Sequence, residues 1–304
     1  MSNQPYGFVE GKKERSRLLG TRQYECRQGL ASQFLAAFTF LLHLGGAMSL
    51  EPCIPSAQFA TVSSPMDADT LALSVNCAAG SVTAEWFGSV VINSTIVVGA
   101  GTRLEITGGD DLAAVDGNSS IRLFEVGEGG YLNLEGVTLK NGKATNIPTK
   151  KFTGEGGAVF VSEGSLNATG CLFEGNRADI DGGCISATND SAVVVEKSVF
   201  LRCWAGIEPA VGDEDAVGDG GGIKVATGKC LITNSLFEDC YAGNKGGGAS
   251  LVNGNFSVSN TTFILNNVGG GLTDEEEDPI GAGGGLVMSD CFEGYDGGNC
   301  TVSS

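Results

Sequence analysis

Histidine, proline and basic side chains are scarce in this chain of 304 residues, and each shortage narrows what the protein can do. The one histidine, His43, lies in an N-terminal segment that is expected to be removed, which leaves the remaining chain without imidazole. Only 7 prolines accompany 48 glycines, a balance that favours an ordered, turn-rich fold over a disordered one. The net charge of -18 excludes ordinary binding to the phosphate backbone, so no nucleic-acid partner is predicted.

A long apolar run is also missing. The longest one, residues 30–44, has about 15 residues, whereas a helix that spans a bilayer needs about 20. Basic residues precede this run and small residues follow it, as in a secretory signal peptide with a long basic n-region. We therefore predict that residues 1–49 are a cleaved signal and that the protein is secreted or held at the cell surface. This prediction is preferred to a signal-anchored membrane form, and the mature chain is not expected to insert into a membrane.

Cysteines and glycosylation sequons agree with an extracellular location. Nine of the ten cysteines remain after cleavage, and an odd number implies at least one thiol that is free or paired with another chain. Seven Asn-X-Ser/Thr sequons support a glycosylated secreted protein. They begin at Asn93, Asn118, Asn167, Asn189, Asn255, Asn260 and Asn299.

A repeat of short apolar strands fills the rest of the chain. Five positions align it: Leu139, Phe173, Phe200, Phe237 and Phe263. The residues seven and five positions earlier are apolar in every unit, and each unit also has a second short strand that follows a Gly-Gly pair such as Gly156-Gly157. Strands this short cannot bury a face alone, so each must stack on the next coil. Units of 26 or 27 residues, where no insertion intervenes, match one coil of a right-handed parallel β-helix, the all-β solenoid that we predict.

The predicted domains follow from this repeat. Residues 50–85 contain Pro52, Cys53, Pro55 and Cys77, a composition expected of an N-terminal cap that covers the open end of the stack. A Cys53–Cys77 disulfide could fasten this cap. Residues 86–304 are predicted to form the coils, and the sequence stops at Ser304 part-way through a unit, as a chain truncated at its C-terminus would.

One corner of the predicted coil carries polar and sulfur-containing side chains. Asn176, Cys203, Cys240 and Asn266 stand three residues after the aligned position. Stacked asparagines predict a ladder of side-chain hydrogen bonds along the axis. Cys203 and Cys240 occupy successive coils, and a spacing of about 4.8 Å lies within the Cα separation that a disulfide tolerates. A Cys203–Cys240 disulfide is one prediction, and two buried thiols that fill an apolar corner are the alternative.

These motifs resemble the polymorphic outer membrane protein repeat. The Gly-Gly-Ala-Val element of residues 156–159 and the pairs Phe173/Asn176 and Phe263/Asn266 carry the resemblance, which covers about residues 120–300. Cys203 and Cys240 depart from the asparagine of that repeat. The resemblance implies the pectin-lyase-like β-helix fold and, as a function, adhesion.

Enzymes of this superfamily are polysaccharide lyases, hydrolases and epimerases. Polygalacturonase-like families carry Asn-Thr-Asp, Asp-Asp, Gly-His-Gly and Arg-Ile-Lys elements, of which this chain has only Asp110-Asp111. A calcium-dependent lyase needs acidic ligands beside a Lys or Arg base. Asp219 with Lys224 could supply both, and so could Asp179 and Asp181 with Arg177. The catalytic candidates are therefore Asp110, Asp111, Asp219 and Lys224.

Insertions follow the aligned position in alternate coils, so the resulting loops are expected to leave the stack from the same corner. Loops on one face of a solenoid commonly form its binding surface. The first loop is basic, with Lys143, Lys150 and Lys151, whereas the later ones are acidic. The acidic loops could hold Ca²⁺ weakly, or they could be solvated segments that bind nothing. The calcium candidates are Asp213, Asp215, Asp219, Asp274 and Asp278, and no other cofactor is predicted.

The function predicted from these residues is a secreted, non-catalytic β-helix module of the cell surface or extracellular matrix that binds glycans or proteins. A polysaccharide lyase, hydrolase or epimerase is the alternative. An enzyme would bring acidic and basic side chains together in a groove along one sheet, whereas a binding module would show apolar stacks and solvated loops.

Overall fold

The computed structural model describes residues 59–77, 80–147, 149–206, 218–269, 283–289 and 300–303. All of them belong to one compact unit, Pro52–Ser304. The predicted signal, residues 1–49, lies outside the described residues. None of the described residues belongs to a helix that is long and apolar enough to cross a membrane.

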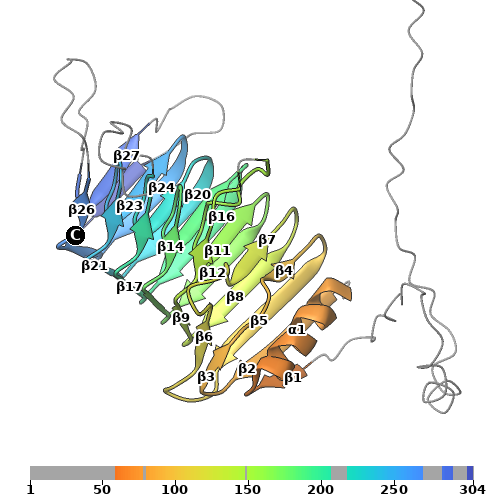
Figure 1. The fold of residues 1–304 in the computed structure, drawn as a ribbon. Helices are drawn as coiled ribbons and strands as arrows, with labels where there is room; N and C mark the ends of the chain where they lie inside the picture. Colours follow the sequence, from red (N-terminus) through yellow and green to blue (C-terminus); the bar gives the residue numbers. More distant parts are fainter. Residues whose placement is uncertain are drawn as a thin grey trace, which may run out of the picture. The chain divides into compact units, whose positions relative to one another are not determined.

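Parallel strands in four sheets, together with one helix, make up most of the described chain (Figure 1). Sheet 1 runs in the order β1 (Phe59–Val62), β2 (Gly80–Trp86), β5 (Thr102–Gly108), β8 (Tyr131–Glu135), β12 (Ser165–Thr169), β16 (Ser191–Glu196), β20 (Gly228–Thr233), β24 (Gly254–Ser259) and β28 (Cys300–Ser303). Sheet 2 contains β3 (Ser89–Val91), β6 (Ala114–Asp116), β9 (Thr138–Lys140), β13 (Leu172–Glu174), β17 (Val199–Leu201), β21 (Leu236–Glu238) and β25 (Thr262–Ile264).

The other two sheets have strands of two residues in sheet 3 and of three or four residues in sheet 4. Sheet 3 contains β10 (Lys143–Ala144), β14 (Arg177–Ala178), β18 (Trp204–Ala205), β22 (Tyr241–Ala242) and β26 (Asn267–Val268). Sheet 4 contains β4 (Ile96–Val98), β7 (Phe124–Val126), β11 (Val159–Ser162), β15 (Ile185–Thr188), β19 (Ile223–Val225), β23 (Ala249–Val252) and β27 (Leu286–Ser289).

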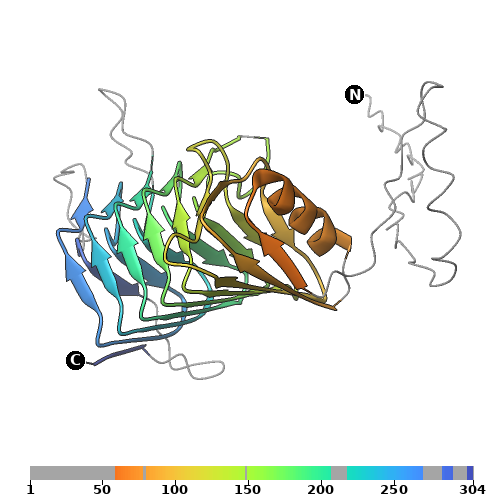
Figure 2. The same ribbon diagram turned by 90° about the horizontal axis from the view of Figure 1, so that it is seen from below.

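The chain visits these sheets in a fixed order, although the two circuits before β8 have no strand in sheet 3. From β8 in sheet 1 it passes to β9 in sheet 2, β10 in sheet 3 and β11 in sheet 4, and it returns to sheet 1 at β12, which pairs with β8. We call one such passage a circuit. Figure 2 shows successive circuits lying side by side along the sheets. The protein is therefore an all-β chain with long parallel sheets, an arrangement compatible with a β-helix solenoid.

The register of the strands confirms the repeat that the sequence predicts. Leu139, Phe173, Phe200, Phe237 and Phe263 are paired in this order across sheet 2. The four phenyl rings stack with centroids 4.6, 4.4 and 4.8 Å apart, and the first three are buried in the core whereas Phe263 is partly buried. The strands that precede this position lie in sheet 1, and the strands that follow each Gly-Gly pair lie in sheet 4.

Alternation along each strand separates the core from solvent, because successive side chains of a strand point to opposite faces. In β12, Leu166 and Ala168 are buried, whereas Asn167 between them is half-exposed. Inward side chains from sheets 1, 2 and 4 join one hydrophobic core, and the inward alanines of sheet 3 are also buried. Each circuit therefore contributes side chains to a core that it shares with its neighbours.

Single residues with positive φ turn the chain at both ends of sheet 2. Residues three before the aligned position take this conformation in the five circuits from Leu139 to Phe263, including Lys197 (φ 50°) and Asn234 (φ 52°). Residues two after it do the same, including Arg202 (φ 52°) and Leu265 (φ 54°). The corners are therefore set by backbone geometry, which non-glycine residues also adopt here at some cost in strain.

The Gly-Gly pairs are needed because two backbone segments meet there. Gly182 has φ 63°, and a Cβ atom at this position would stand 2.2 Å from the carbonyl oxygen of Ile185. A Cβ atom on Gly183 would stand 2.3 Å from the carbonyl oxygen of Gly221 in the next circuit. Only glycine fits both positions, which explains why the pair recurs at the entry to sheet 4.

Helix α1 (Pro65–Cys77) packs against the strands at one end of the stack (Figure 2). Its residues Leu71 and Val75 are buried in the core, and the helix contacts β1, β3 and β4, which are the end strands of three sheets. Ser64 caps the helix: its hydroxyl accepts a hydrogen bond from the backbone N–H of Asp67. The Asp67 carboxylate in turn accepts hydrogen bonds from Ser64 and Ser63, which lowers the pKa of Asp67.

Candidate functional site

The corner between sheets 3 and 4 brings charged side chains together. The residue before each Gly-Gly pair recurs at this corner, as Glu155, Asp181, Asp219 and Lys245. Their main chains lie in successive circuits, because the carbonyl oxygens of Asp181, Asp219 and Lys245 accept hydrogen bonds from the first glycine of the preceding circuit. Three carboxylates and one ammonium group are therefore attached at equivalent positions along the stack.

Asp219 lies at the centre of this group. Its carboxylate accepts hydrogen bonds from Lys224 Nζ at 2.5 Å and from Asn244 Nδ2 at 3.0 Å. Its backbone N–H donates to Asp181 Oδ1 at 2.8 Å. Lys224 Nζ also donates to Ser250 Oγ at 3.2 Å, and the Lys224 side chain is only 8% exposed. The result is an ion pair shielded on the outer face of sheet 4.

Glu155 extends the group by one circuit. Ser186 Oγ donates to Glu155 Oε2 at 3.0 Å, and Ser186 is paired with Lys224 across sheet 4. Burial and the neighbouring Asp181 carboxylate raise the pKa of Glu155. Burial also raises the pKa of Asp181, against the opposing effect of Lys224. Two carboxyl groups at this corner therefore keep their protons to a higher pH than usual.

The connection from β10 to β11, which is the first insertion, packs on sheet 4 beside this group. The Arg122 guanidinium donates hydrogen bonds to the carbonyl oxygens of Phe152 at 2.6 Å and Glu155 at 2.7 Å. It also lies 4.9 Å from the ring centroid of Phe160, which stacks on Phe152. Burial of the guanidinium lowers the pKa of Arg122. Arg122 thus clamps the insertion over the outer face of sheet 4.

The structure divides the predicted catalytic candidates. It brings Asp219 and Lys224 together, as that prediction requires, but it does not place Asp110 and Asp111 with them. These two aspartates lie in the connection from sheet 1 to sheet 2, and the exposed Asp110 carboxylate accepts hydrogen bonds from the backbone N–H groups of Gly88 and Leu112. Asp110 therefore stabilises a turn.

Of the calcium candidates, only Asp219 is among the described residues, and Lys224 already neutralises it. Asp213, Asp215, Asp274 and Asp278 lie outside the described residues. Within the part of the chain that the structure describes, no group of three or more His, Cys, Asp or Glu side chains could hold a metal ion.

The predicted Cys203–Cys240 disulfide is wrong. Cys203 is bonded to Cys184, with a Cα–Cα distance of 5.5 Å, and Cys240 is a buried free thiol. Side chains at equivalent positions of successive circuits run parallel about 4.8 Å apart, whereas the Cβ atoms of a disulfide are about 3.8 Å apart. Cys184 instead stands just before β15 of sheet 4, and Cys203 stands just before β18 of sheet 3, so the disulfide joins the starts of two different sheets. Cys53 lies outside the described residues, so its pairing with Cys77 stays a prediction.

The predicted asparagine ladder is also corrected. Asn266 Nδ2 donates to the carbonyl oxygen of Phe237 at 2.9 Å, and its Oδ1 accepts from the N–H of Cys240 at 3.0 Å. Asn176 makes the equivalent pair of bonds, to Leu139 and Gly142. Each asparagine therefore binds the main chain of the preceding circuit, and Cys203 rather than an asparagine follows Asn176 at the next level.

A column of cationic and aromatic side chains covers the outer face of sheet 3. Five residues are in register along it: Lys143, Arg177, Trp204, Tyr241 and Asn267. The Trp204 and Tyr241 rings stack with centroids 4.0 Å apart, and the Arg177 guanidinium lies 5.5 Å from the Trp204 ring centroid. Neither Lys143 nor Arg177 forms an ion pair with a described residue. We call these five residues the sheet 3 column.

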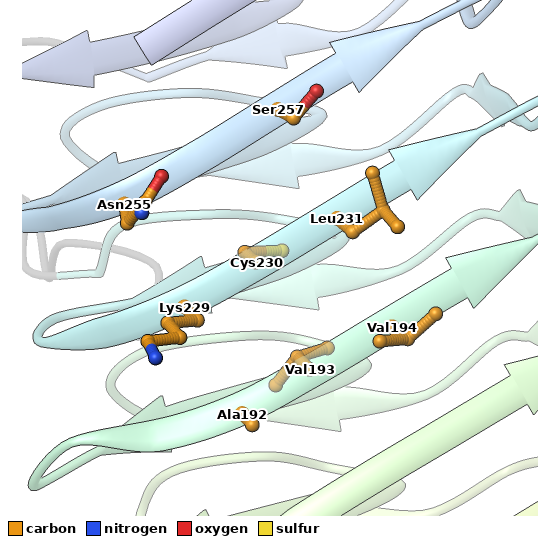
Figure 3. A pocket seen from close by; sticks show the side chains of 8 residues that line it. All are labelled: Ala192, Val193, Val194, Lys229, Cys230, Leu231, Asn255 and Ser257. Carbon is orange, nitrogen blue, oxygen red and sulfur yellow. The ribbon is translucent and has the colours of Figure 1, made fainter. Parts of the chain in front are cut away.

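Two hollows lie on other faces. One, of about 530 Å³, is lined by Glu128, Glu163, Asn189 and Asp190 at the turns from sheet 4 to sheet 1. The other, of about 290 Å³, lies on the outer face of sheet 1 and is lined by β16, β20 and β24 (Figure 3). Its outward side chains are Ala192, Val194, Lys229, Leu231, Asn255 and Ser257.

Comparison with known proteins does not assign a family: no family model, no curated protein and no solved structure matches this chain. The resemblance to the polymorphic outer membrane protein repeat therefore stays a prediction.

Proposed function

We propose that this chain is a secreted, right-handed parallel β-helix that acts without catalysis and binds an anionic glycan through the sheet 3 column. The fixed order in which the chain visits the four sheets supports the β-helix, and the in-register residues agree with a repeat of the polymorphic outer membrane protein type. The contacts of α1 with three end strands support its role as part of an N-terminal cap. Secretion is supported by the signal-like N-terminus and the sequons.

The sheet 3 column carries this proposal. In a chain with a net charge of -18, Lys143 and Arg177 have no acidic partner among the described residues, so they remain available to an anion. Arginine binds carboxylate or sulfate groups through two parallel hydrogen bonds, and Trp204 and Tyr241 add apolar surface beside it. The connection that leaves β10 also carries the exposed Lys150 and Lys151. A polymer with regularly spaced negative charges matches these cations better than a neutral one.

The experiment is a binding measurement on acidic polysaccharides. The secreted chain is titrated with pectate, alginate and a sulfated glycan, with a neutral glucan as reference, at two salt concentrations. Arg177→Ala should weaken binding about tenfold, because a hydrogen bond to a charged group is lost. Arg202→Ala is the matched control, since this exposed arginine is already paired with Glu174.

Two results would overturn the proposal. One is that Arg177→Ala binds as tightly as the wild type and the Arg202→Ala control. The other is that affinity for the neutral glucan equals that for the acidic polymers, since the cations of the column would then contribute nothing. Binding that weakens at high salt in the wild type, and less so in Arg177→Ala, is the expected outcome.

A polysaccharide lyase, hydrolase or epimerase is the second candidate, and the group around Asp219 favours it. Perturbed carboxyl groups beside a lysine are found at many active sites, as well as in structural ion networks. Against catalysis, Lys224 already donates to Asp219 and Ser250, and each carboxylate of the group has a protein partner.

Turnover assays separate the two candidates. Reducing-sugar release and the absorbance of unsaturated uronates are measured on the same polysaccharides with added calcium. An enzyme would lose activity in Lys224→Met and keep it in Lys229→Met, a control on the outer face of sheet 1. No turnover by the folded wild-type chain would leave the binding function as the working account.

A further inference from the structure

The hollow on sheet 1 contains a complete glycosylation sequon, Asn255-Phe256-Ser257, within β24 (Figure 3). Because side chains alternate along a strand, Asn255 and Ser257 point outward together while Phe256 is buried in the core. The acceptor amide and the hydroxyl of the sequon therefore both line the hollow.

The floor of this hollow is apolar. Val194 and Leu231 are 36% and 39% exposed, and they are paired side by side across β16 and β20. The equivalent positions of earlier circuits are polar, namely Glu105, Asn133 and Asn167. These two neighbouring aliphatic side chains form a small apolar surface on a sheet face that is polar at the equivalent positions of earlier circuits.

The other sequon within a strand of sheet 1 differs in its contacts. Asn167 also points outward, but its Nδ2 donates to Asn133 Oδ1 at 2.7 Å. Asn255 Nδ2 has no hydrogen-bond partner among the described residues, and Asn255 is exposed. The amide of Asn255 is thus the one of these two that can carry a sugar without losing a protein contact.

We propose that Asn255 carries an N-linked glycan whose first sugar lies in this hollow, with the apolar face of its ring over Leu231 and Val194. This inference rests on the proposed secretion. In the transfer, Asn255 Nδ2 loses a proton and bonds to C1 of N-acetylglucosamine, while the bond from C1 to a lipid-linked diphosphate donor breaks and the lipid diphosphate leaves. The host secretory pathway supplies this donor. The glycan then covers the aliphatic pair that the sheet leaves exposed.

The experiment measures occupancy and protection at single sequons. The full chain is expressed in eukaryotic cells and collected from the medium, and each sequon is scored by peptide mass spectrometry. The folded glycoprotein is then treated with a peptide N-glycosidase, and the rate of release at Asn255 is compared with that at Asn118, which is exposed on a turn outside the hollow. Release at Asn255 should be about tenfold slower, because the first sugar is packed against apolar surface.

Two variants test the hollow itself. Leu231→Ser should bring release at Asn255 close to the rate at Asn118, because it removes the larger of the two aliphatic contacts. Val97→Ser is the matched control: Val97 is 37% exposed on β4 of sheet 4, away from the hollow, and its substitution should leave the rate unchanged. Leu231→Thr, which keeps a branched side chain suited to a strand, repeats the test if the serine variant is poorly secreted.

The outcomes distinguish this inference from the proposed function. A secreted chain that is glycosylated elsewhere but empty at Asn255 overturns the inference alone. So does an occupied Asn255 whose glycan is released as fast as that of Asn118, or at a rate that Leu231→Ser does not change. A chain that never reaches the medium and carries no glycan overturns the proposed secretion as well.

Discussion

Loss of the Cys184–Cys203 disulfide is expected to destabilise the fold by about 3 kcal/mol. The bond joins residues 19 apart, and the ring that it closes contains β15, β16 and β17. A cross-link over this length removes about 11 cal/mol/K of entropy from the unfolded chain, which is about 3 kcal/mol at 25 °C. The estimate depends on the length of the ring alone.

The measurement is urea unfolding of the double variant Cys184→Ala/Cys203→Ala, followed by circular dichroism. The double substitution avoids leaving one unpaired thiol. Adding a reductant should lower the wild type to the stability of the double variant and leave the variant unchanged. Cys171→Ala is the control for truncation alone, since Cys171 is a buried free thiol.

Two observations would refute this reasoning. Peptide mapping that finds Cys203 bonded to Cys240 would mean that the corner is assembled differently. A loss of less than about 1 kcal/mol in the double variant, corrected for the Cys171→Ala control, would mean that the ring adds little to the restraint already imposed by stacking. In Cys184→Ala alone, Cys203 should stay unpaired, because Cys240 stands beside it in a parallel orientation.

Three further predictions concern the core, the charged corner and the turns. Phe200→Ala should lower the free energy of unfolding in urea by about 3–5 kcal/mol, because it leaves a cavity between two stacked rings. Phe263→Ala should lower it by less, because Phe263 has one stacked neighbour and is only partly buried. Equal losses in the two variants would contradict this reasoning. Because the pKa values of Glu155 and Asp181 are raised, the folded chain holds protons that the unfolded chain releases. The contribution of these two carboxyl groups to stability is therefore present below about pH 4 and is lost as the pH rises through their raised pKa values. Unfolding from pH 4 to pH 7 should show this decline, and Glu155→Gln/Asp181→Asn should flatten it; an unchanged slope would argue against the buried carboxyls as its source. Lys197→Gly should raise the midpoint of thermal unfolding and the free energy of unfolding by up to about 1 kcal/mol, because Lys197 has φ 50° and glycine adopts this conformation without strain. Little is lost with the side chain, since its ion pair with Glu196 is exposed. A lower midpoint would show that the lysine side chain stabilises the fold more than the turn strains it.

The parts of the fold that could be predicted from the sequence are those in which one residue type recurs at one position. Phenylalanine at equivalent places fixes the register of sheet 2, since a one-residue slip would turn Phe173 and Phe200 outward. The Gly-Gly pairs could likewise be found by their spacing. Helix α1 was not predicted, although Ser64, Pro65 and Asp67 form a recognisable start of a helix.

The candidate site could be predicted only in part, because it depends on contacts across a corner. Asp219 and Lys224 are five residues apart and were found together in sequence, whereas Glu155 and Asp181 come from other circuits. A visible signal existed: the residue before each Gly-Gly pair is charged at four successive levels. The partner of Cys203 could not be identified from the repeat. Stacking places Cys240 beside Cys203 in the next circuit, but the disulfide is made with Cys184.

The direction of the hydrogen bonds between circuits has a mechanical consequence. These bonds run along the stack, so a force applied to the two ends of the chain would open them pair by pair and release circuits in succession. The circuit from Asn176 to Cys203 spans 27 residues and would add about 90 Å of contour length when freed. Its disulfide keeps 19 of these residues in a closed ring, so only about a third of that length is gained until the bond is reduced. The redox state of the surroundings would therefore set how far this part of the protein can stretch under load.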